Sequence, residues 1–453
     1  MFFLYILLAI LMFGFLIFIH ELGHFLVARR CGVEILEFSI GFGPVLVSKR
    51  SRKSGTLYAL RLLPLGGYVN MLGETGMEVV QGSSEGETLP EELSAEVTTV
   101  ETVVDEEKAK RAYCNKSVWQ RILISLAGPL MNLVLGFLLM FGMVCIQGAP
   151  AMGSTNVAAF YVEYTAEEPA FGFLPGDNIY SIDGKYVSSF ANLKKYVAET
   201  GGSRVVTVTV QRYDEEKNEV LKVDLGEVTL TSALLDSNFR GSLSEGNGEN
   251  ALKIGDEIVK VNSTPVHTYA ELSYEMMNQG HKPLRLTVIR NGEKTVIENV
   301  QIPQYVEQGA TFGMPDFRVF GEKVTFGSII KHSFYRSIST VKMVYDSIFG
   351  LFSGRYGVEA VTGPVGITKT IAEVAQTSWL NVLHLFIVIS INLGVMNLLP
   401  VPGLDGGHIL IYFIEIIRRK PMKKELEGVI NFIGLLLLLT LAVVITIKDV
   451  IAL

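Results

Sequence analysis

The sequence predicts a multi-pass α-helical membrane protein with four transmembrane helices and two α+β modules outside the membrane. Three observations predict this class. The 453-residue chain is 49% hydrophobic and has a mean hydropathy of +0.36, which is high for a soluble protein. Four stretches reach the roughly 20 apolar residues that cross a bilayer. The long polar segment between the second and third stretches contains an internal repeat.

The predicted spans cover residues 1–27, 121–147, 379–401 and 425–447. The first has neither a basic n-region nor a small-residue cleavage site, so we interpret it as a retained span. The second span contains Gly128, Pro129 and the polar Asn132, and the third contains the polar residues His384, Asn392 and Asn397. Because polar groups inside a span are costly and usually face protein or water, these two spans are expected to do more than anchor the chain.

Basic residues indicate the orientation of the spans. They are frequent after the first span (Arg29, Arg30, Lys49, Arg50, Arg52, Lys53, Arg61) and in the loop after the third (Arg418, Arg419, Lys420, Lys423, Lys424). The positive-inside rule makes both segments cytoplasmic. Both termini and the polar middle are then expected on the far side of the membrane, which is the periplasm if the membrane is the inner membrane of a Gram-negative bacterium. The net charge of −7 sums regions on both sides and indicates no partner.

Residues 74–120 are predicted to be an acidic linker that follows a cytoplasmic region over 28–73. From Glu74 to Glu107 there are eleven acidic residues and no Lys or Arg. Such a composition is typical of a solvated, flexible tether. A regulatory contact is the alternative.

The polar middle repeats one pattern. GDNIYSID, from Gly176, and GDEIVKVN, from Gly255, begin 79 residues apart, and each is followed by a short helical pattern and an alternating strand. This domain-sized period predicts two copies of one β-rich module, over 155–230 and 235–305. The region contains none of the three cysteines (Cys31, Cys114, Cys145), so no disulfide is expected within it.

An amphipathic helix is predicted over residues 324–350. Apolar residues recur on one face, and the basic residues fall elsewhere (apolar Ile330, Phe334, Ile338, Val341, Tyr345, Ile348; basic Lys331, Arg336, Lys342). The pattern indicates a helix in the membrane interface. The alternative is a helix packed on the soluble modules.

The stretch with most chemical content is HELGH, at the end of the first span. His20 and His24 lie on one helical face, where they can bind one metal ion, and Glu21 lies beside them. Zinc held by two imidazoles and a carboxylate keeps a position for water, and a nearby glutamate can move the proton. The alternative is a polar helix end that reaches the membrane interface.

The third ligand must come from elsewhere, and Asp405 in NLLPVPGLDGGH is the best candidate. Pro400 and Pro402 interrupt the third span there, and non-helical backbone at membrane depth is tolerated where it lines a cavity. The segment 402–424 is read as this LDGG stretch followed by a cytoplasmic loop. His408 is a competing ligand that spacing alone does not exclude.

These motifs together resemble the site-2 protease family of intramembrane zinc metalloproteases, in the regulator of sigma-E protease branch that carries two PDZ domains. The resemblance covers nearly the whole chain. It rests on HELGH and NLLPVPGLDGGH and on five further motifs (GFGP from Gly41, PLGGYV from Pro64, NKSVWQR from Asn115, AGPLMN from Ala127, TGPVGI from Thr362).

The resemblance implies that His20, His24 and Asp405 bind Zn²⁺ and that Glu21 is the catalytic acid/base. It also assigns Asn392 and Asn397 to substrate binding, whereas hydrogen bonding between helices is the alternative on physical grounds. The stretch Thr56 to Val69 would form a membrane-associated β-hairpin, whose edge could pair with an extended substrate.

The repeats are similar to PDZ domains, so the implied modules are periplasmic, PDZ-like and able to bind peptides or C-termini. In this family they are thought to exclude substrates with bulky periplasmic domains. Two features depart from the pattern. The acidic linker is longer than usual, and the first module lacks a clear glycine-rich carboxylate loop.

The sequence therefore predicts an intramembrane endopeptidase for single-pass membrane proteins. By resemblance these are an anti-sigma factor after a first cleavage and remnant signal peptides, within regulated intramembrane proteolysis during envelope stress. No nucleic-acid partner is expected. The alternatives are an HExxH protease with a glutamate third ligand acting on exposed peptides, a PDZ scaffold or inactive relative, and an enzyme latent until an upstream cleavage.

Overall fold

The computed structural model describes residues 2–74, 110–214, 219–245, 251–307, 309–357 and 361–451. The chain divides into two compact units. Residues 1–138, 362–375 and 382–453 form one, here called the membrane unit. Residues 139–361 and 376–381 form the other, here called the β unit. The predicted acidic linker falls mostly outside the described residues.

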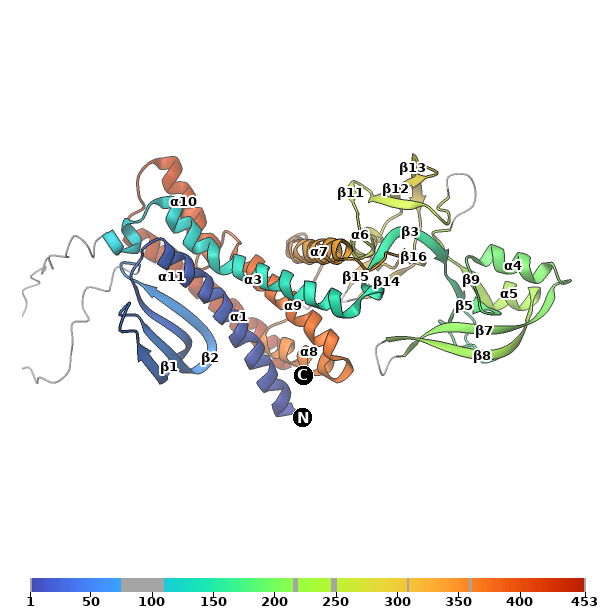
Figure 1. Cartoon of the computed structure of the whole chain (residues 1–453), viewed down its shortest axis with the longest axis horizontal. Coiled ribbons are helices and arrows are strands. Elements are labelled where there is room, and N and C mark those ends of the chain that lie inside the picture. Colours follow the sequence, from blue (N-terminus) through green and yellow to red (C-terminus); the bar gives the residue numbers. More distant parts are fainter. Residues whose placement is uncertain are drawn as a thin grey trace, which may run out of the picture. The chain divides into compact units, whose positions relative to one another are not determined.

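Helices dominate the membrane unit (Figure 1). They are α1 (Phe2–Arg30), α3 (Val118–Gln147), α8 (Pro364–Thr377), α9 (Trp379–Asn397), α10 (Asp405–Arg418) and α11 (Lys424–Ile451), with a short 3-10 turn, η1 (Tyr113–Asn115). Four of them (α1, α3, α9, α11) are long and apolar enough to cross a membrane, and they fall at the four predicted spans. Only 6% of the apolar window of α11 is buried, against 28–33% in the other three, so α11 is the most exposed of the four.

Two boundaries near the third span differ from the sequence prediction. The helix α9 ends at Asn397 rather than at 401, because a residue before proline disfavours helical backbone and Pro400 follows closely. Much of the segment predicted as a loop over 402–424 is the amphipathic helix α10, which Arg419 ends in a left-handed conformation with φ of 54°.

Specific contacts join the helices of the membrane unit. The Ser390 hydroxyl of α9 donates to the backbone carbonyl of Asn132 in α3 at 2.9 Å. Phe15 of α1 lies against Phe386 of α9, with ring centroids 6.1 Å apart. The carboxylate of Asp449 in α11 accepts the backbone N–H groups of Gly363 and Gly366 at the start of α8, both at 2.9 Å. This carboxylate satisfies N–H groups that the beginning of a helix leaves free.

A small sheet in the membrane unit consists of β1 (Ile35–Arg50) and β2 (Leu57–Met71). Both strands bend, and segment 35–40 pairs with 57–60 on one side and with 67–71 on the other. Segment 45–50 pairs with the far side of 57–61. The stretch 56–69 is therefore not a hairpin by itself, because residues 35–40 lie between its two ends. Segment 67–71 forms one edge of the sheet.

The β unit contains two sheets of the same design. The first has the order β8-β7-β5-β4-β9 with β6 on β5, and the second has the order β13-β12-β10-β3-β16 with β11 on β10. The first module comprises β4 (Val162–Tyr164), β5 (Asn178–Ile182), β6 (Lys185–Tyr186), α4 (Phe190–Ala198), β7 (Ser203–Asp214), β8 (Glu219–Thr231), α5 (Ser232–Asn238) and β9 (Phe239–Gly241). Each sheet covers its own buried apolar cluster.

The second module encloses the first in sequence. It comprises β3 (Gly153–Phe160), β10 (Glu257–Val261), β11 (Thr264–Pro265), α6 (Tyr269–Gln279), β12 (Leu284–Arg290), β13 (Glu293–Val300), a hairpin of β14 (Gln304–Glu307) and β15 (Ala310–Gly313), and β16 (Phe317–Gly321). The predicted limits 155–230 and 235–305 are therefore wrong for β3, β9 and β16. Strand pairing over long sequence distances leaves no local sequence signal that would have shown this.

The repeated Gly-Asp pair has the same role in both modules. Asp177 binds Arg212 through two hydrogen bonds of 2.8 and 2.7 Å, and Asp256 binds Arg290 through two of 2.7 Å. Both aspartate side chains are almost fully buried. A bidentate guanidinium–carboxylate pair satisfies such a buried charge, which explains why the repeat preserves Asp at this point.

The predicted amphipathic helix is α7 (Phe326–Phe352), in the β unit. Its polar side packs against α6, where Asp346 accepts hydrogen bonds from Tyr274 and Asn278 at 2.7 and 3.0 Å. Its other side exposes large apolar residues (Phe326, Ile330, Phe334, Ile338, Tyr345, Phe349, Phe352). In α7, packing on the second β module and an exposed apolar face thus occur together.

Candidate metal centre

The two histidines of HELGH face each other across one turn of α1. Their Nε2 atoms are 3.2 Å apart, and both side chains are buried. The i and i+4 spacing produces this arrangement, because residues four apart lie one above the other on a helix.

Asp405, the first residue of α10, completes a cluster of three with His20 and His24. Its Oδ2 atom lies 3.1 Å from Nε2 of His20, and its Oδ1 atom lies 3.4 Å from Nε2 of His24. A tetrahedral ion with ligand bonds of about 2.0–2.1 Å separates its donor atoms by about 3.3 Å. These three side chains therefore fit a zinc ion, with a fourth position left for water.

Backbone and amide groups of α3 orient the two imidazoles. Nδ1 of His24 lies 2.7 Å from the carbonyl oxygen of Ile124, so this nitrogen donates its hydrogen and Nε2 is left as an acceptor for a metal. Nδ1 of His20 lies 3.3 Å from the Asn132 amide nitrogen, while the buried Asn132 Oδ1 has no hydrogen-bond partner. Turning this amide by 180° lets Oδ1 accept from Nδ1–H, and Nε2 of His20 is then also free to bind metal.

Gly128 brings the backbone of α3 against both imidazoles. A Cβ atom at this position would lie 2.2 Å from Nε2 of His24 and 2.8 Å from Nε2 of His20. Only glycine leaves this space open. Gly128 and Asn132 stand out in the sequence as unusual residues in an apolar span, but no local pattern there indicates their role beside the histidines.

A pocket of about 300 Å³ opens beside the histidines and is lined by Glu21 as well. The edge segment of β2 forms another wall through Tyr68, Val69 and Met71. A Cβ atom on Gly67 would lie 3.0 Å from the carbonyl oxygen of Ser39 and 3.1 Å from Cγ of Glu21, so the sheet passes close to the glutamate at this glycine. The edge of the sheet and the candidate base thus lie next to each other.

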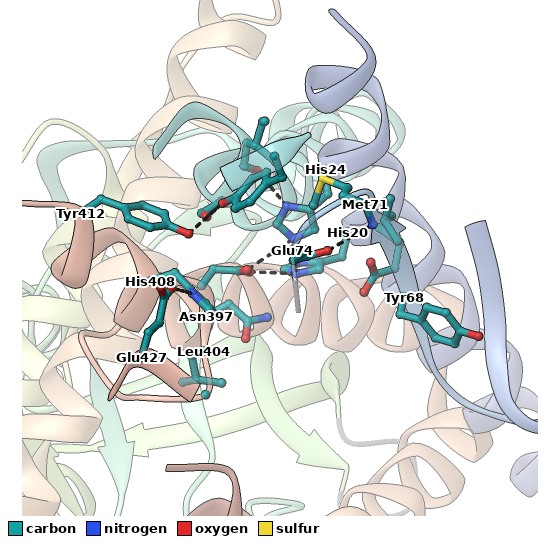
Figure 2. A pocket seen from close by; sticks show the side chains of 17 residues that line it. His20, His24, Tyr68, Met71, Glu74, Asn397, Leu404, His408, Tyr412 and Glu427 are labelled. Atoms are coloured by element: carbon teal, nitrogen blue, oxygen red, sulfur yellow. Dashed lines mark hydrogen bonds and ion pairs between the residues drawn. The ribbon is translucent and has the colours of Figure 1, made fainter. Parts of the chain in front are cut away.

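The remaining predicted site residues separate into two groups. Asn397 and His408 line the pocket (Figure 2). His408 is not part of the three-residue cluster, and its Nδ1 atom lies 3.5 Å from Glu427 of α11. Asn392 is exposed on α9 and does not line the pocket.

A polar network missed by sequence analysis holds α10 against α3. The hydroxyl groups of Tyr113 and Tyr412 are 2.9 Å apart. Arg121 donates to the buried Glu415 at 2.6 Å, and the other oxygen of Glu415 accepts the backbone N–H of Met422 at 2.7 Å. Because Asp405 begins α10, these contacts fix the third candidate ligand. Residues so far apart in sequence leave no local signal.

A helix-borne HExxH pair that meets an aspartate from a second helix defines a membrane-embedded metallopeptidase. Comparison with known proteins agrees with this class. The chain matches peptidase family M50 over residues 8–441, and it belongs to this family, the site-2 proteases. It is a zinc metalloprotease.

Its relatives extend over almost the whole chain. It is 30% identical to the zinc metalloprotease RasP of Geobacillus kaustophilus, over 97% of this chain and 96% of that protein. It is 29% identical to the regulator of sigma-E protease RseP of Escherichia coli, over 94% of each. It is 28% identical to the regulator of sigma-W protease RasP of Bacillus subtilis, over 97% of each.

Proposed function

We propose that this protein is an intramembrane endopeptidase that cleaves single-pass membrane proteins within or near their span. One observation carries the proposal: two histidines of a membrane-spanning helix and Asp405 of another helix converge beside Glu21. The names of the relatives from Escherichia coli and Bacillus subtilis point to sigma-factor regulation, which supports an anti-sigma factor after a first cleavage as the favoured substrate. Remnant signal peptides are a second substrate class, implied by the family resemblance alone.

His20, His24 and Asp405 hold zinc in this proposal. When bound, zinc polarises the scissile carbonyl and makes water a stronger nucleophile near neutral pH. Glu21 takes the proton of the attacking water and delivers it to the leaving amine nitrogen. Asn132 and the carbonyl of Ile124 keep the imidazoles in the tautomer that binds metal.

Substrate reaches this site in an extended form. The edge segment 67–71 of β2 passes Glu21, and its backbone can pair with an unwound substrate segment. The same sheet also exposes Phe42, Leu46 and Val47, as expected of a membrane-associated element. Asn397 lines the pocket and can hold the substrate backbone. Asn392 would have to act at the approach to the pocket.

The two modules of the β unit are proposed to be periplasmic and PDZ-like, and to limit access to substrates with small periplasmic parts. Their shared design, in which α4 or α6 follows a Gly-Asp strand, supports this reading. The charge distribution supports a cytoplasmic position for the metal centre, at the end of α1 that carries Arg29 and Arg30.

The test is cleavage of a single-pass reporter with a short periplasmic tail by the full-length protein and by Glu21→Gln at equal expression. The substitution retains shape and metal ligands but removes the base. Cleavage by the parent alone is expected, and the fragments locate the cut within or near the span. Cleavage by both proteins, or a cut far outside the membrane, would refute the proposal.

A further inference from the structure

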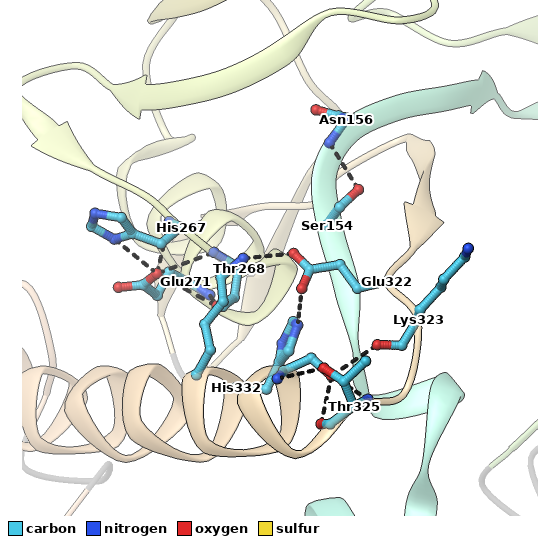
Figure 3. Close-up of polar contacts among 11 residues, drawn as sticks. Ser154, Asn156, His267, Thr268, Glu271, Glu322, Lys323, Thr325 and His332 are labelled. Carbon is cyan, nitrogen blue, oxygen red and sulfur yellow. Dashed lines mark hydrogen bonds and ion pairs between the residues drawn. The ribbon is translucent and has the colours of Figure 1, made fainter.

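A second pocket lies in the β unit, away from the metal-binding cluster. It has a volume of about 580 Å³ and is lined by residues that include Gln147, Gly153, Tyr269, Arg336 and Leu380. Arg336 is the one charged residue among all those that line it. Figure 3 shows the nearby polar contacts of α7 around Thr325 and His332.

Arg336 has no acidic partner among the described residues, in contrast to three other part-buried arginines. Its guanidinium donates to the neutral Gln147 side chain at 3.2 Å, and no carboxylate lies within ion-pair distance among the described residues. Arg121, Arg212 and Arg290 each pair with a buried carboxylate. Burial lowers the pKa of Arg336, as expected for a cation that the protein does not neutralise.

The pocket has a second source of positive potential. Tyr269 and Ala270, the first two residues of α6, line it, so the N-terminus of that helix faces the same space as the guanidinium. The Glu271 carboxylate caps the preceding N–H groups of His267 and Thr268 and lies outside the pocket lining. A guanidinium and a helix N-terminus together favour an anion with several oxygen atoms, and phosphate suits the bidentate geometry of arginine.

The position of the pocket along the chain indicates where this phosphate comes from. Gln147 is the last residue of α3 and Leu380 the second residue of α9, and both helices are candidate membrane spans. Ring contact between Phe141 of α3 and Phe326 of α7, at 6.5 Å, brings the start of α7 alongside the apolar part of a span. Span ends lie at the level of lipid headgroups, where the exposed Trp379 is also typical.

We propose that Arg336 and the N-terminus of α6 bind the phosphate of a phospholipid headgroup at the end of α3. The exposed Ile146 beside the pocket and the apolar face of α7 would contact the acyl chains. The bound lipid neutralises the unpaired guanidinium and attaches the second module of the β unit to the membrane surface.

Native mass spectrometry of the full-length protein in detergent, titrated with phosphatidylglycerol, tests this inference. The parent is expected to bind one lipid that Arg336→Gln binds at least tenfold more weakly, with Arg336→Lys in between because a lysine keeps the charge but not the fork. Lys331→Gln, which removes a charge from the same helix outside the pocket, should bind as the parent does. Amide-exchange protection of α6 and α7 verifies that each variant is folded.

Two further ligands separate the possible sources of binding. Diacylglycerol, which has the chains but no phosphate, should not compete, and inorganic phosphate should compete only at far higher concentration. Equal lipid binding by Arg336→Gln and the parent, or equal binding of diacylglycerol, would overturn the proposal. Inorganic phosphate that binds as tightly as the lipid would overturn the phospholipid assignment.

Discussion

Nδ1 of His24 in α1 donates a hydrogen bond to the backbone carbonyl of Ile124 in α3 across 2.7 Å. This contact selects the imidazole tautomer whose Nε2 atom faces Asp405. The helix α3 has no side chain in the three-residue cluster. It nevertheless orients an imidazole of the cluster, whose members come from α1 and α10.

Asp405→Ala is expected to abolish zinc binding, because two imidazoles alone hold zinc much more weakly than a three-ligand site. The parent should contain about one zinc per chain, as a site with three protein ligands does. Elemental analysis of purified protein measures this. His408→Ala is the matched control, since His408 lines the pocket outside the cluster, and it should retain its zinc. Loss of zinc in His408→Ala would mean that the ligand set is different.

Asn132→Ala should weaken zinc binding by about 10–100-fold, the usual effect of removing a group that orients a metal-bound histidine. The change leaves Nδ1 of His20 without its neighbour at 3.3 Å. Competition with a chromophoric chelator measures the affinity. Asn392→Ala removes an amide that lies outside the pocket lining and should leave zinc affinity unchanged. Equal affinities of all three proteins would show that Asn132 does not orient His20.

Gly128→Ala is expected to eliminate both zinc binding and proteolysis, because the added methyl group would occupy the space beside the two Nε2 atoms. Gly142→Ala is a matched change on the same helix, where no atom lies within 4 Å of the new Cβ, and it should behave as the parent. Zinc content and reporter cleavage measure this effect, and amide-exchange protection of α3 equal to that of the parent distinguishes a blocked site from a misfolded protein. A fully active Gly128→Ala protein would contradict the packing described here.

Asp256→Ala should destabilise the second module by about 3 kcal/mol, the cost of leaving one partner of a buried ion pair alone. Amide hydrogen exchange of the full-length protein should show lost protection in β10 and β12, with β5 and β7 of the first module unchanged. Asp236→Ala removes an exposed pair with Lys194 and should have little effect. Unchanged protection in Asp256→Ala would show that the buried pair contributes no stability.

Acidification should loosen the start of α7. Burial lowers the pKa of His332 below its ordinary 6.5; Glu322, 3.2 Å away, opposes this shift, and Lys331 and Arg336 add to it. When the start of α7 loosens, the His332 side chain binds a proton more readily than it does in the packed structure. The packing of the start of α7 is therefore complete above about pH 6.5 and weakens as the pH falls below that value. The pKa of Glu322 is also lowered, so protonation of this carboxylate weakens the packing further only below about pH 4.5.

Hydrogen exchange of residues 326–340, corrected for intrinsic rates, checks this at about pH 7.5 and about pH 5.5, on either side of the histidine titration. His332→Gln should reduce the difference between the two conditions. The same pH difference in both proteins would exclude His332 as its origin.

The sequence by itself determined the elements whose signals are local. Apolar length marked four spans, helical spacing paired His20 with His24, and the Gly-Asp repeat located two β-rich modules. Each follows from hydrophobic length or from the period of one helix or strand, which neighbouring residues reveal without knowledge of the fold.

Only the tertiary structure decided which distant segments meet. It placed Asp405 rather than His408 beside the histidines, and it turned Asn132 toward His20. It also placed residues 35–40 between the two ends of β2, and β3 in the second module's sheet. These pairings depend on how helices pack and strands align over hundreds of residues, and no local pattern encodes them because many partners satisfy the same apolar or strand-forming requirement.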